Sequence, residues 1–207
     1  MGTKHGKKKY NFPRLSILVI GNYQSGRTAL INCYEYIIKT NKEYDEKNNQ
    51  PLDLDTQRKI NTIFRDFIPV DHTIKGENNE DITIKVKIWD SLGRERISYY
   101  VGAIKYSHGI ILTYDISSRE SFEALNKWIS QIKDGQDISI FPIVIVGCKF
   151  DLEDKREVST EEGKKFAEKY NLTFFETSAL TGKGVKEAFS TLIQKAYEIK
   201  IKSIHYK

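Results

Sequence analysis

The 207-residue sequence holds only two cysteines, four prolines and one methionine, and it lacks any long apolar run. Cys33 and Cys148 lie far apart without the spacing of metal ligands, so neither a disulfide framework nor a zinc site is expected. No apolar stretch approaches the roughly 20 residues that a membrane span requires, and the polar, basic N-terminus is unlike a secretory signal. These absences favour a cytoplasmic protein, and the length suits one domain with a sizeable core.

The net charge of +5 comes largely from the two termini. Lysines gather at both ends of the chain: Lys4, Lys7, Lys8 and Lys9 at the first, and Lys195, Lys200, Lys202 and Lys207 at the second. We expect residues 1–13 to form a flexible basic arm and residues 201–207 a short basic tail, both solvated. Contact with acidic lipid is the alternative, and no nucleic-acid partner is expected.

Apolar runs that alternate with helical patterns predict an α/β fold. The expected strands are Arg14–Ile20, Gly109–Tyr114, Pro142–Val146 and Leu172–Glu176, and the expected helices are Ala29–Thr40, Arg119–Lys133, Glu161–Tyr170 and Val185–Ile199. The continuous apolar runs are typical of parallel strands buried on both faces. Strands alternating with helices imply a doubly wound sheet with right-handed crossovers, whose ligands bind beyond the carboxyl ends of the strands.

Two further strands are predicted to form an antiparallel hairpin. They cover Pro69–Lys75 and Asp81–Trp89, with the turn near Asn78-Asn79. In the second strand isoleucine and valine alternate with threonine and lysine. Because successive side chains of a strand point to opposite faces, this alternation indicates one wet face, as on an edge.

A glycine-bounded loop, Gly21 to Thr28, lies between the first predicted strand and the first predicted helix. The spacing G-x-x-x-x-G-x-[ST] fits a P-loop, in which backbone N–H groups hold phosphates at a helix N-terminus. The seventh position is Arg27 where the motif has lysine, so the match is imperfect. A plain strand-to-helix turn is the alternative when this loop is taken alone.

Three other polar loops follow predicted strands. Asp90, with Gly93 three residues later, can hold Mg2+ through water and sense a terminal phosphate. Asp151 can accept two hydrogen bonds from the N1 and N2 edge of guanine, and Lys149 can lay its aliphatic stem across the base. The small residues of Thr177–Gly182 let backbone N–H groups approach a base carbonyl. Each of these loops alone is explained as well by an ordinary polar turn.

Together, the four loops in this order resemble those of the Ras superfamily of small GTPases, and most closely those of its Rab branch, over residues 14–200. Further matching stretches are Trp89-Asp90, Tyr99-Tyr100, His108-Gly109-Ile110-Ile111, Tyr114-Asp115, Glu120-Ser121-Phe122, Trp128, Val144 to Gly147, and Glu176-Thr177-Ser178-Ala179. The resemblance implies the P-loop fold of small G proteins, a mostly parallel six-stranded sheet with one antiparallel edge strand and helices on both faces.

The resemblance also implies cofactors and the residues that bind them. A GTP or GDP site is expected at Gly21, Gln24, Ser25, Gly26, Arg27, Thr28, Gly93, Cys148, Lys149, Asp151, Ser178, Ala179 and Leu180. A Mg2+ site is expected at Thr28 and Asp90.

Departures from the family gather at the phosphate end. Arg27 keeps the charge of the family lysine, but its planar fork needs more room than an ammonium. Tyr23 and Gln24 replace small residues, one of them glycine, and can crowd the outer phosphate. Counted back from Asp90 without gaps, Phe67 takes the position of the threonine that binds Mg2+ and senses GTP.

The catalytic positions depart as well. Pro69 replaces a switch glycine, Leu92 replaces an alanine, and Arg94 replaces the glutamine that orients the attacking water. Family members turn over at only about 10⁻⁴ s⁻¹ unaided, so losing that glutamine and a metal ligand predicts hydrolysis below easy detection. No catalytic residue is therefore assigned. Arg94 acting as a built-in arginine finger is the alternative.

More of the family pattern survives at the base end. Lys149, Asp151 and Ala179 match it, whereas Cys148, a weak hydrogen-bonding group, replaces the asparagine that ties the base loop to the P-loop. Asp151 and Thr28 can support nucleotide binding that is weak or biased toward GDP.

A polar insertion at about residues 41–60 gives the chain about twenty residues more than the family has before Phe67, and lengthening a loop costs only about 0.6 kcal/mol per doubling. It begins with Asn41–Pro51, expected to be a loop, and a short helix capped by Asp53 or Asp55 is expected to follow. The insertion is either a tolerated surface loop or a partner surface that replaces the normal switch.

Membrane attachment is also expected to differ. Rab proteins carry prenylated cysteines at the C-terminus, whereas this sequence ends Ser203–Lys207 without cysteine, so no prenylation is expected. Gly2 stands at a myristoylation position, although Gly6 lies where that signal has serine or threonine. With Lys7–Lys9 it would supply the two signals that stable anchoring needs, so peripheral attachment to endomembranes is the alternative to a merely flexible arm.

Three hypotheses follow from these patterns. The first is a divergent Rab-like G protein that binds guanine nucleotide, hydrolyses GTP weakly or not at all, and regulates vesicle traffic through effector or regulatory proteins. The second is a pseudoGTPase, a nucleotide-independent scaffold that binds proteins through its switch or insertion surface. The third is an active GTPase that uses unconventional residues.

Overall fold

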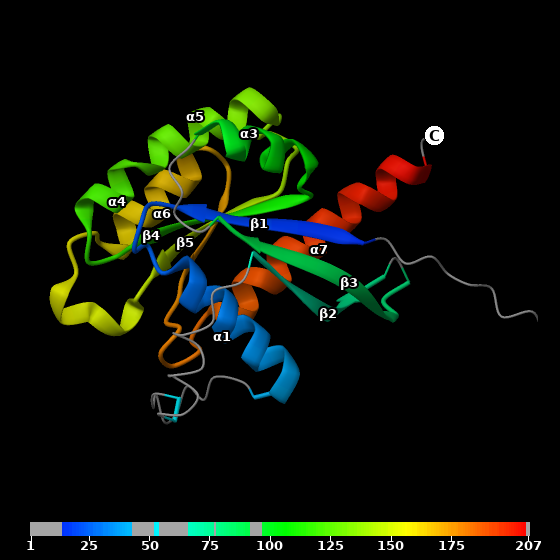
Figure 1. Cartoon of the computed structure of the whole chain (residues 1–207), viewed down its shortest axis with the longest axis horizontal. Coiled ribbons are helices and arrows are strands. Elements are labelled where there is room, and N and C mark those ends of the chain that lie inside the picture. Colours follow the sequence, from blue (N-terminus) through cyan, green and yellow to red (C-terminus); the bar gives the residue numbers. More distant parts are fainter. Residues whose placement is uncertain (1–13, 43–51, 54–65, 77, 92–96, 206–207) are drawn as a thin grey trace, which may run out of the picture.

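One mixed sheet of six strands forms the centre of the computed structural model, which describes residues 14–42, 52–53, 66–76, 78–91 and 97–205 (Figure 1). The strand order is β2-β3-β1-β4-β5-β6; β2 pairs antiparallel with β3, and every other pair is parallel. The strands are β1 Leu15–Gly21, β2 Phe67–Lys75, β3 Asp81–Asp90, β4 Gly109–Asp115, β5 Ile143–Cys148 and β6 Thr173–Glu176. The predicted sheet with one antiparallel edge strand is thereby confirmed.

Helices cover both faces of this sheet. They are α1 Arg27–Thr40, α3 Ile97–Tyr106, α4 Arg119–Glu123, α5 Leu125–Gly135, α6 Thr160–Lys169 and α7 Val185–His205, with a 3-10 helix, η1, at Phe150–Lys155. In Figure 1, α1 lies below the sheet and α3 and α5 lie above it. Helices therefore cover the central strands β1, β4 and β5 on both faces, as their apolar runs predicted.

Strand β1 shows how the core divides between the faces. Ile17 and Val19 pack in a cluster with residues of α1 and α7, whereas Leu18 and Ile20 pack in a second cluster with residues of α3, α5 and α6. Because side chains alternate across a strand, a strand covered on both faces is expected to be mostly apolar. This accounts for the apolar residues of β1, which Ser16 alone interrupts between Leu15 and Ile20.

The alternating pattern of β3 has a different cause from the one predicted. This strand is second from the edge, between β2 and β1, so the wet face does not mark an edge position. On that face the hairpin carries exposed residues, and their side chains pair across the strands in Asp71–Lys85 and Lys75–Asp81 ion pairs. One face of β3 is therefore left uncovered although both of its edges are paired.

Other predicted elements shift or divide. The predicted helix Arg119–Lys133 is two helices, α4 and α5, which meet at Ala124 with backbone angles still close to helical (φ −64°, ψ −17°). The last helix continues to His205, beyond the expected end at Ile199. The predicted arm, residues 1–13, and the short helix expected after residue 53 lie outside the described residues.

Helix α3 was not predicted at all. Its sequence, ISYYVGAIKY, is rich in β-branched and aromatic residues and contains a glycine. These residues are weak helix formers, so local propensity does not favour a helix there.

No described helix is long and apolar enough to cross a membrane.

Candidate nucleotide-binding site

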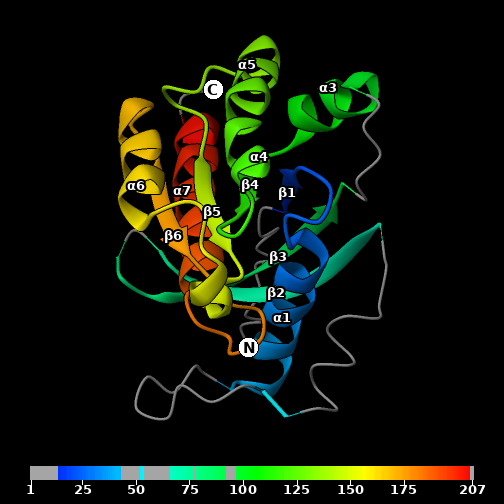
Figure 2. The ribbon, with the colours of Figure 1, turned by 90° about the vertical axis from the view of Figure 1, so that its left-hand side faces the viewer.

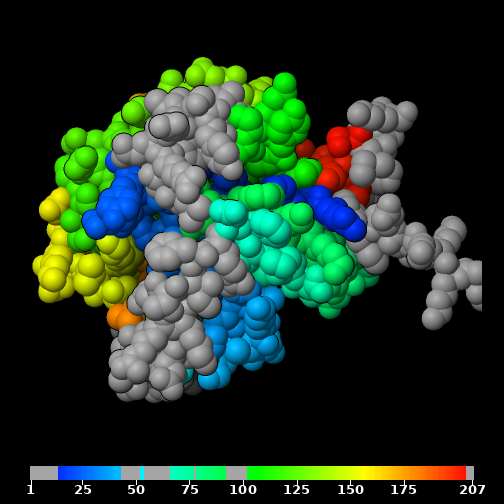
Figure 3. Space-filling view, viewed as in Figure 1, coloured from blue at the N-terminus to red at the C-terminus, as the bar shows by residue number. Residues whose placement is uncertain are grey.

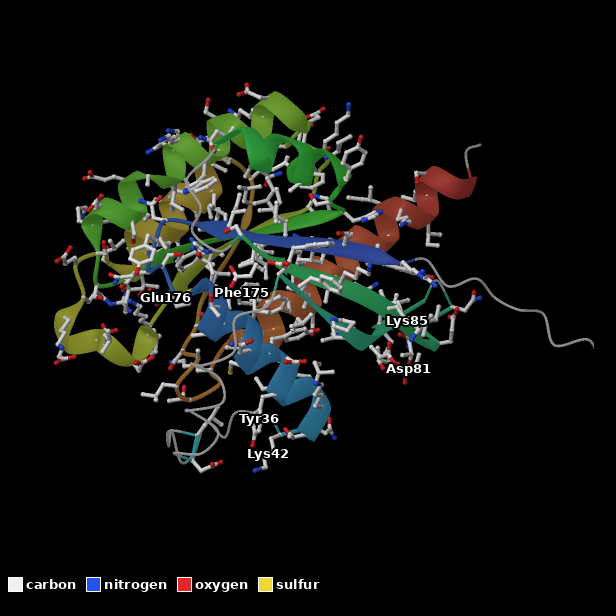
Figure 4. The ribbon with its side chains drawn as sticks, viewed as in Figure 1. Tyr36, Lys42, Asp81, Lys85, Phe175 and Glu176 are labelled. Atoms are coloured by element: carbon white, nitrogen blue, oxygen red, sulfur yellow. The ribbon has the colours of Figure 1, made fainter. Side chains whose placement is uncertain are left out.

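Each predicted site loop follows a strand at the same end of the sheet, which faces the viewer in Figure 2. The register explains why the loops meet: Val19 of β1 lies opposite Asp90 of β3, and Gly147 of β5 lies opposite Glu176 of β6, the residue labelled in Figure 4. On the surface, the blue residues that follow β1 lie near the yellow residues around η1 (Figure 3). Parallel strands thus bring distant sequence motifs to one place.

The loop from Gly21 to Gly26 leaves little space for side chains. A Cβ on Gly21 would collide with the Thr113 backbone and hydroxyl, and a Cβ on Gly26, whose φ is 92°, would lie 3.0 Å from the Cβ of Cys148. Ser25 Oγ shares a hydrogen bond of 2.7 Å with Thr113 Oγ1 beneath the loop. Both glycines are therefore required by close packing, as a phosphate cradle at the start of α1 would need.

The outer part of the same loop carries larger side chains. Gln24 adopts a left-handed backbone conformation (φ 61°) and is exposed, and Tyr23 is 68% exposed. The Asn22 side chain is held from the other side, because Trp128 of α5 donates from Nε1 to Asn22 Oδ1 at 3.0 Å. The loop is thus supported both from beneath and by α5.

Arg27 is buried and engages the loop that precedes it. Its guanidinium donates through Nη1 to the carbonyl oxygens of Gly21 and Asn22, the second at 2.6 Å. Its Nε lies 3.6 Å from Asp90 Oδ1 at the end of β3. The positive charge expected in a P-loop is therefore present, and it is bound to loop carbonyls and to Asp90.

The two predicted metal ligands lie together. Thr28 donates from Oγ1 to Asp90 Oδ2 at 2.5 Å. Oxygen atoms of this kind suit Mg2+, which usually takes one or two protein ligands together with phosphates and water. Within the described part of the chain, no group of three or more His, Cys, Asp and Glu side chains could hold a metal alone. The donor set of Thr28 and Asp90 thus fits a metal site that needs phosphate to complete it.

Phe67 lies on the other face of the sheet from Asp90. It pairs with Trp89 across the hairpin, the two ring centroids lie 4.8 Å apart, and Lys87 Nζ lies 4.9 Å from the Phe67 centroid. Because Trp89 and Asp90 are consecutive in a strand, their side chains point to opposite faces. The Phe67 side chain is therefore turned away from Thr28 and Asp90. Leu92, Gly93 and Arg94 lie outside the described residues.

At the base end, two loops are joined by several hydrogen bonds. Ser178 donates from Oγ to Asp151 Oδ1 at 2.5 Å, Phe150 N donates to Thr177 O at 3.0 Å, and Thr177 N donates to Gly147 O at 2.8 Å. Thr177 and Ser178 are almost completely buried. The carboxylate of Asp151 is therefore held in one orientation and keeps lone pairs with which it can accept further hydrogen bonds.

Lys149 and Cys148 connect this end to its surroundings. Lys149 adopts a left-handed backbone conformation (φ 64°), and its ammonium binds Asp115 Oδ2 at 2.6 Å. Burial raises the pKa of the Cys148 thiol to about 12, so the group is neutral. It accepts a long contact of 3.9 Å from Thr177 Oγ1 and packs against Gly26. The base loop and the P-loop thus meet through packing at Cys148.

Ala179 and Leu180 lie in the loop before α7. Ala179 packs against the core cluster shared with α1 and α7, and the Leu180 carbonyl accepts a hydrogen bond of 2.8 Å from the backbone N–H of Leu52. The loop closes on itself through Ser178, whose Oγ accepts from Thr181 N and whose carbonyl accepts from Gly182 N. All described residues predicted for the base end therefore come together.

Four residues of the site were not among the predicted site residues: Thr113 beneath the P-loop, Asp115 beside Lys149, Trp128 beside Asn22, and Leu52 beside Leu180. Thr113 and Asp115 lie at the C-terminal end of β4, at the same end of the sheet as the motifs. Because ligands of such sheets bind beyond the carboxyl ends of the strands, that position could have marked them as site residues. The contacts of Trp128 and Leu52 have no local sequence signal.

Comparisons with known proteins agree with this geometry. The model of the Ras family matches residues 16–198. The chain is 32% identical to the Ras-related protein Rab-11A of Dictyostelium discoideum over 210 residues, which cover 99% of this chain and 86% of the relative. It is 43% identical to the Ras-related protein RGP2 of Oryza sativa subsp. japonica over 137 residues, 64% of this chain and 61% of the relative. Ras-related protein RABA4b of Arabidopsis thaliana is 42% identical over 123 residues, 57% of this chain and 53% of the relative. The chain therefore belongs to the Ras family of small GTPases and is similar to its Rab members.

Proposed function

We propose that this protein binds a guanine nucleotide mainly through its base loops and hydrolyses GTP weakly or not at all. Ras-family proteins bind GTP or GDP with Mg2+ and act through effectors and regulators. The observation that carries the proposal is the contrast between the two ends of the site. Asp151 is oriented by Ser178 at 2.5 Å, whereas the Phe67 ring packs on Trp89 across the sheet from Asp90.

At the base end, recognition follows from hydrogen-bond chemistry. Asp151 accepts from Ser178 through Oδ1 and can accept from the N1 and N2 groups of guanine with its remaining lone pairs. Hydrogen bonds to a charged group contribute about 1.5–3 kcal/mol each, so this carboxylate can give both affinity and preference for guanine. Lys149, whose ammonium is held by Asp115, would lay its aliphatic stem across the base.

At the phosphate end, a positive charge is present, but the residues expected to bind the phosphates differ from those of the family. Thr28 and Asp90 would hold Mg2+, which neutralises phosphate charge when bound. Arg27 would face the phosphates with a guanidinium whose hydrogen bonds already go to Gly21 and Asn22. We therefore expect the phosphates to add less affinity than in relatives with lysine, and GDP and GTP to bind with similar strength.

Hydrolysis is expected to be slower than the roughly 10⁻⁴ s⁻¹ of an unaided family member. Arg94 stands where the family has the glutamine that orients the attacking water, and the position of the metal-binding threonine is Phe67. Arg94 acting as an arginine finger would instead give measurable phosphate release that an Arg94→Ala variant loses.

By its similarity to Rab proteins, we place the role of the chain in vesicle traffic at endomembranes. Effector or regulatory proteins would bind the switch region or the insertion at about residues 41–60. Lengthening a surface loop by such an insertion adds little to the free energy of loop closure. The basic residues 1–13 would provide peripheral attachment to acidic lipid.

The second candidate is a scaffold that needs no nucleotide. One observation favours it: the guanidinium of Arg27 satisfies carbonyl oxygens of its own loop and lies 3.6 Å from Asp90, so the loop is held together by protein groups. A loop whose polar groups already have protein partners gains less binding free energy from a phosphate than a loop whose charged groups are unpaired.

Isothermal titration with GDP and GTP, with and without Mg2+, separates the two candidates. The proposal expects a dissociation constant below about 100 µM for at least one of them. Weaker binding of both would favour the scaffold. Measurement of phosphate release by the wild type and by Arg94→Ala in the same preparation tests the third hypothesis, an active enzyme.

A further inference from the structure

The insertion is attached to the base loop at one described point. The backbone N–H of Leu52 donates to the Leu180 carbonyl at 2.8 Å, although the two residues lie far apart in the sequence. The Leu52 side chain is half-buried and packs against the core cluster that also contains Ala179. Leu52 is thus held through its backbone and through its side chain.

A second contact fixes the place where the insertion leaves α1. Lys42 Nζ lies 5.8 Å from the centroid of the Tyr36 ring, and the two side chains are close together in Figure 4. The pKa of Lys42 is raised by a hydrogen bond with Tyr36 and, to a smaller extent, by the charge of Asp53. Lys42, which precedes residues 43–51, is thus held near the Tyr36 ring at the end of α1.

The residue that accepts from Leu52 belongs to the loop that orients Asp151. Within this loop Ser178 Oγ accepts from Thr181 N at 3.2 Å and Ser178 O accepts from Gly182 N at 2.8 Å, while Ser178 itself donates to Asp151. Leu180 lies between these bonded residues. A displacement of Leu52 must therefore be absorbed by the turn whose hydroxyl holds the base-recognising carboxylate.

We propose that Leu52 is a positioning residue for the base loop, so that the insertion and the guanine site act as one coupled unit. The inference rests on the proposed function, since it concerns the same base site. Coupling is reciprocal by thermodynamic necessity: a protein partner that moves the insertion changes nucleotide affinity, and bound nucleotide changes the affinity for that partner by the same factor.

Two substitutions at one position separate the roles of the backbone and the side chain. Leu52→Pro removes the N–H donor, whereas Leu52→Ala keeps it and removes most of the side chain. Losing a hydrogen bond of ordinary strength predicts that Leu52→Pro weakens GDP binding by about threefold to tenfold, and that Leu52→Ala weakens it less. Pyrophosphate, which has no base, should bind the wild type and both variants within about twofold of one another.

The results have distinct meanings. GDP binding unchanged in Leu52→Pro, an equal loss for pyrophosphate, or an equal loss in Leu52→Ala would overturn the assignment to the Leu52 amide. No GDP binding by the wild type would instead refute the proposed function. Should Leu52→Pro fail to fold, trypsin cleavage of the wild type after Lys47 decides: GDP must slow it several-fold and pyrophosphate must not, and equal rates with GDP and without ligand would overturn the coupling.

Discussion

Single residues decide how the two ends of this site differ. Arg27 occupies the position of a phosphate-binding lysine, but its guanidinium is bound to two loop carbonyls and lies 3.6 Å from Asp90. Asp151, in contrast, keeps lone pairs that Ser178 does not use. A guanidinium is a rigid fork and an ammonium is a compact point charge, so the same charge serves phosphate differently in the two residues.

Replacing Arg27 with lysine should therefore strengthen the binding of GTP and GDP by about tenfold, or 1.4 kcal/mol. The shorter head group would be freer to reach the outer phosphates while keeping the charge. Titration calorimetry on the wild type and Arg27→Lys measures the change. Arg27→Gln, which removes the charge, is the control and should not gain affinity; a lysine variant that binds no more tightly than wild type would contradict this account.

Individual site residues were predictable where a motif fixes both residue type and spacing. This holds for Gly21, Gly26, Thr28 and Asp151, which the structure brings to one end of the sheet. Their partners were not predictable, because the contacts of Asn22 with Trp128 and of Leu180 with Leu52 join distant parts of the chain. Such pairs depend on how elements pack, and no local pattern contains that information.

Among the elements, those buried on both faces of the sheet were the easiest to predict. A parallel strand covered by helices is mostly apolar, so β1, β4 and β5 appear as nearly continuous apolar runs. Helix α3 was missed because its β-branched and aromatic residues give little helical preference, which tertiary structure overrides. The boundary between α4 and α5 also lacks a sequence signal, since Ala124 is a good helix former.

Replacing either of two helical glycines with alanine should change the free energy of unfolding, in opposite directions at the two positions. A Cβ on Gly163 of α6 would lie 2.5 Å from the Tyr114 hydroxyl and 2.6 Å from the Phe174 ring, whereas a Cβ on Gly102 of α3 would meet no atom within 4 Å. Gly163→Ala should destabilise the protein by about 1–3 kcal/mol through overpacking, despite the better helix propensity of alanine. The matched control Gly102→Ala should stabilise it by up to about 1 kcal/mol.

Urea unfolding of the two variants measures these changes directly. The account expects the midpoints to move in opposite directions from that of the wild type. If both midpoints rose, α6 would not pack on Tyr114 and Phe174 as described.

Considered as a whole, the molecule has a polar pair within its core that ties α1 to β2. Tyr34 Oη and His72 Nδ1 lie 2.7 Å apart, and both residues are buried. Burial, with a smaller contribution from the charge of Lys186, lowers the pKa of His72 from 6.5 to about 4. Between these values the unfolded chain binds a proton at this position and the folded protein does not, so the contribution of His72 to stability is present above pH 6.5 and is lost on acidification toward pH 4.

The free energy of unfolding should thus fall by up to about 3 kcal/mol over this range because of His72. A Tyr34→Phe, His72→Leu double variant removes both polar partners together, leaving no unpaired group, and its stability should depend less on pH. Urea unfolding at several pH values compares the two proteins. Parallel pH profiles would show that His72 does not titrate as its burial requires.

For the whole molecule, the fold and the family could be predicted from the sequence. The function depends on which parts of the nucleotide site still bind the base, the phosphates and the metal. The base loops are held by Ser178, Thr177 and Asp115, and the ring of Phe67 packs on Trp89. The insertion joins the base loop at Leu180. The central claim is therefore that guanine recognition persists where cleavage of the terminal phosphate does not.

One measurement tests this claim most directly. The purified protein is loaded with GTP, incubated, freed of unbound nucleotide and denatured, and the released nucleotide is identified by chromatography. The account predicts that guanine nucleotide is recovered and remains GTP for longer than about two hours, the half-time that corresponds to a rate of 10⁻⁴ s⁻¹. Recovery of no guanine nucleotide, or conversion of most of the bound GTP to GDP within that time, would contradict it.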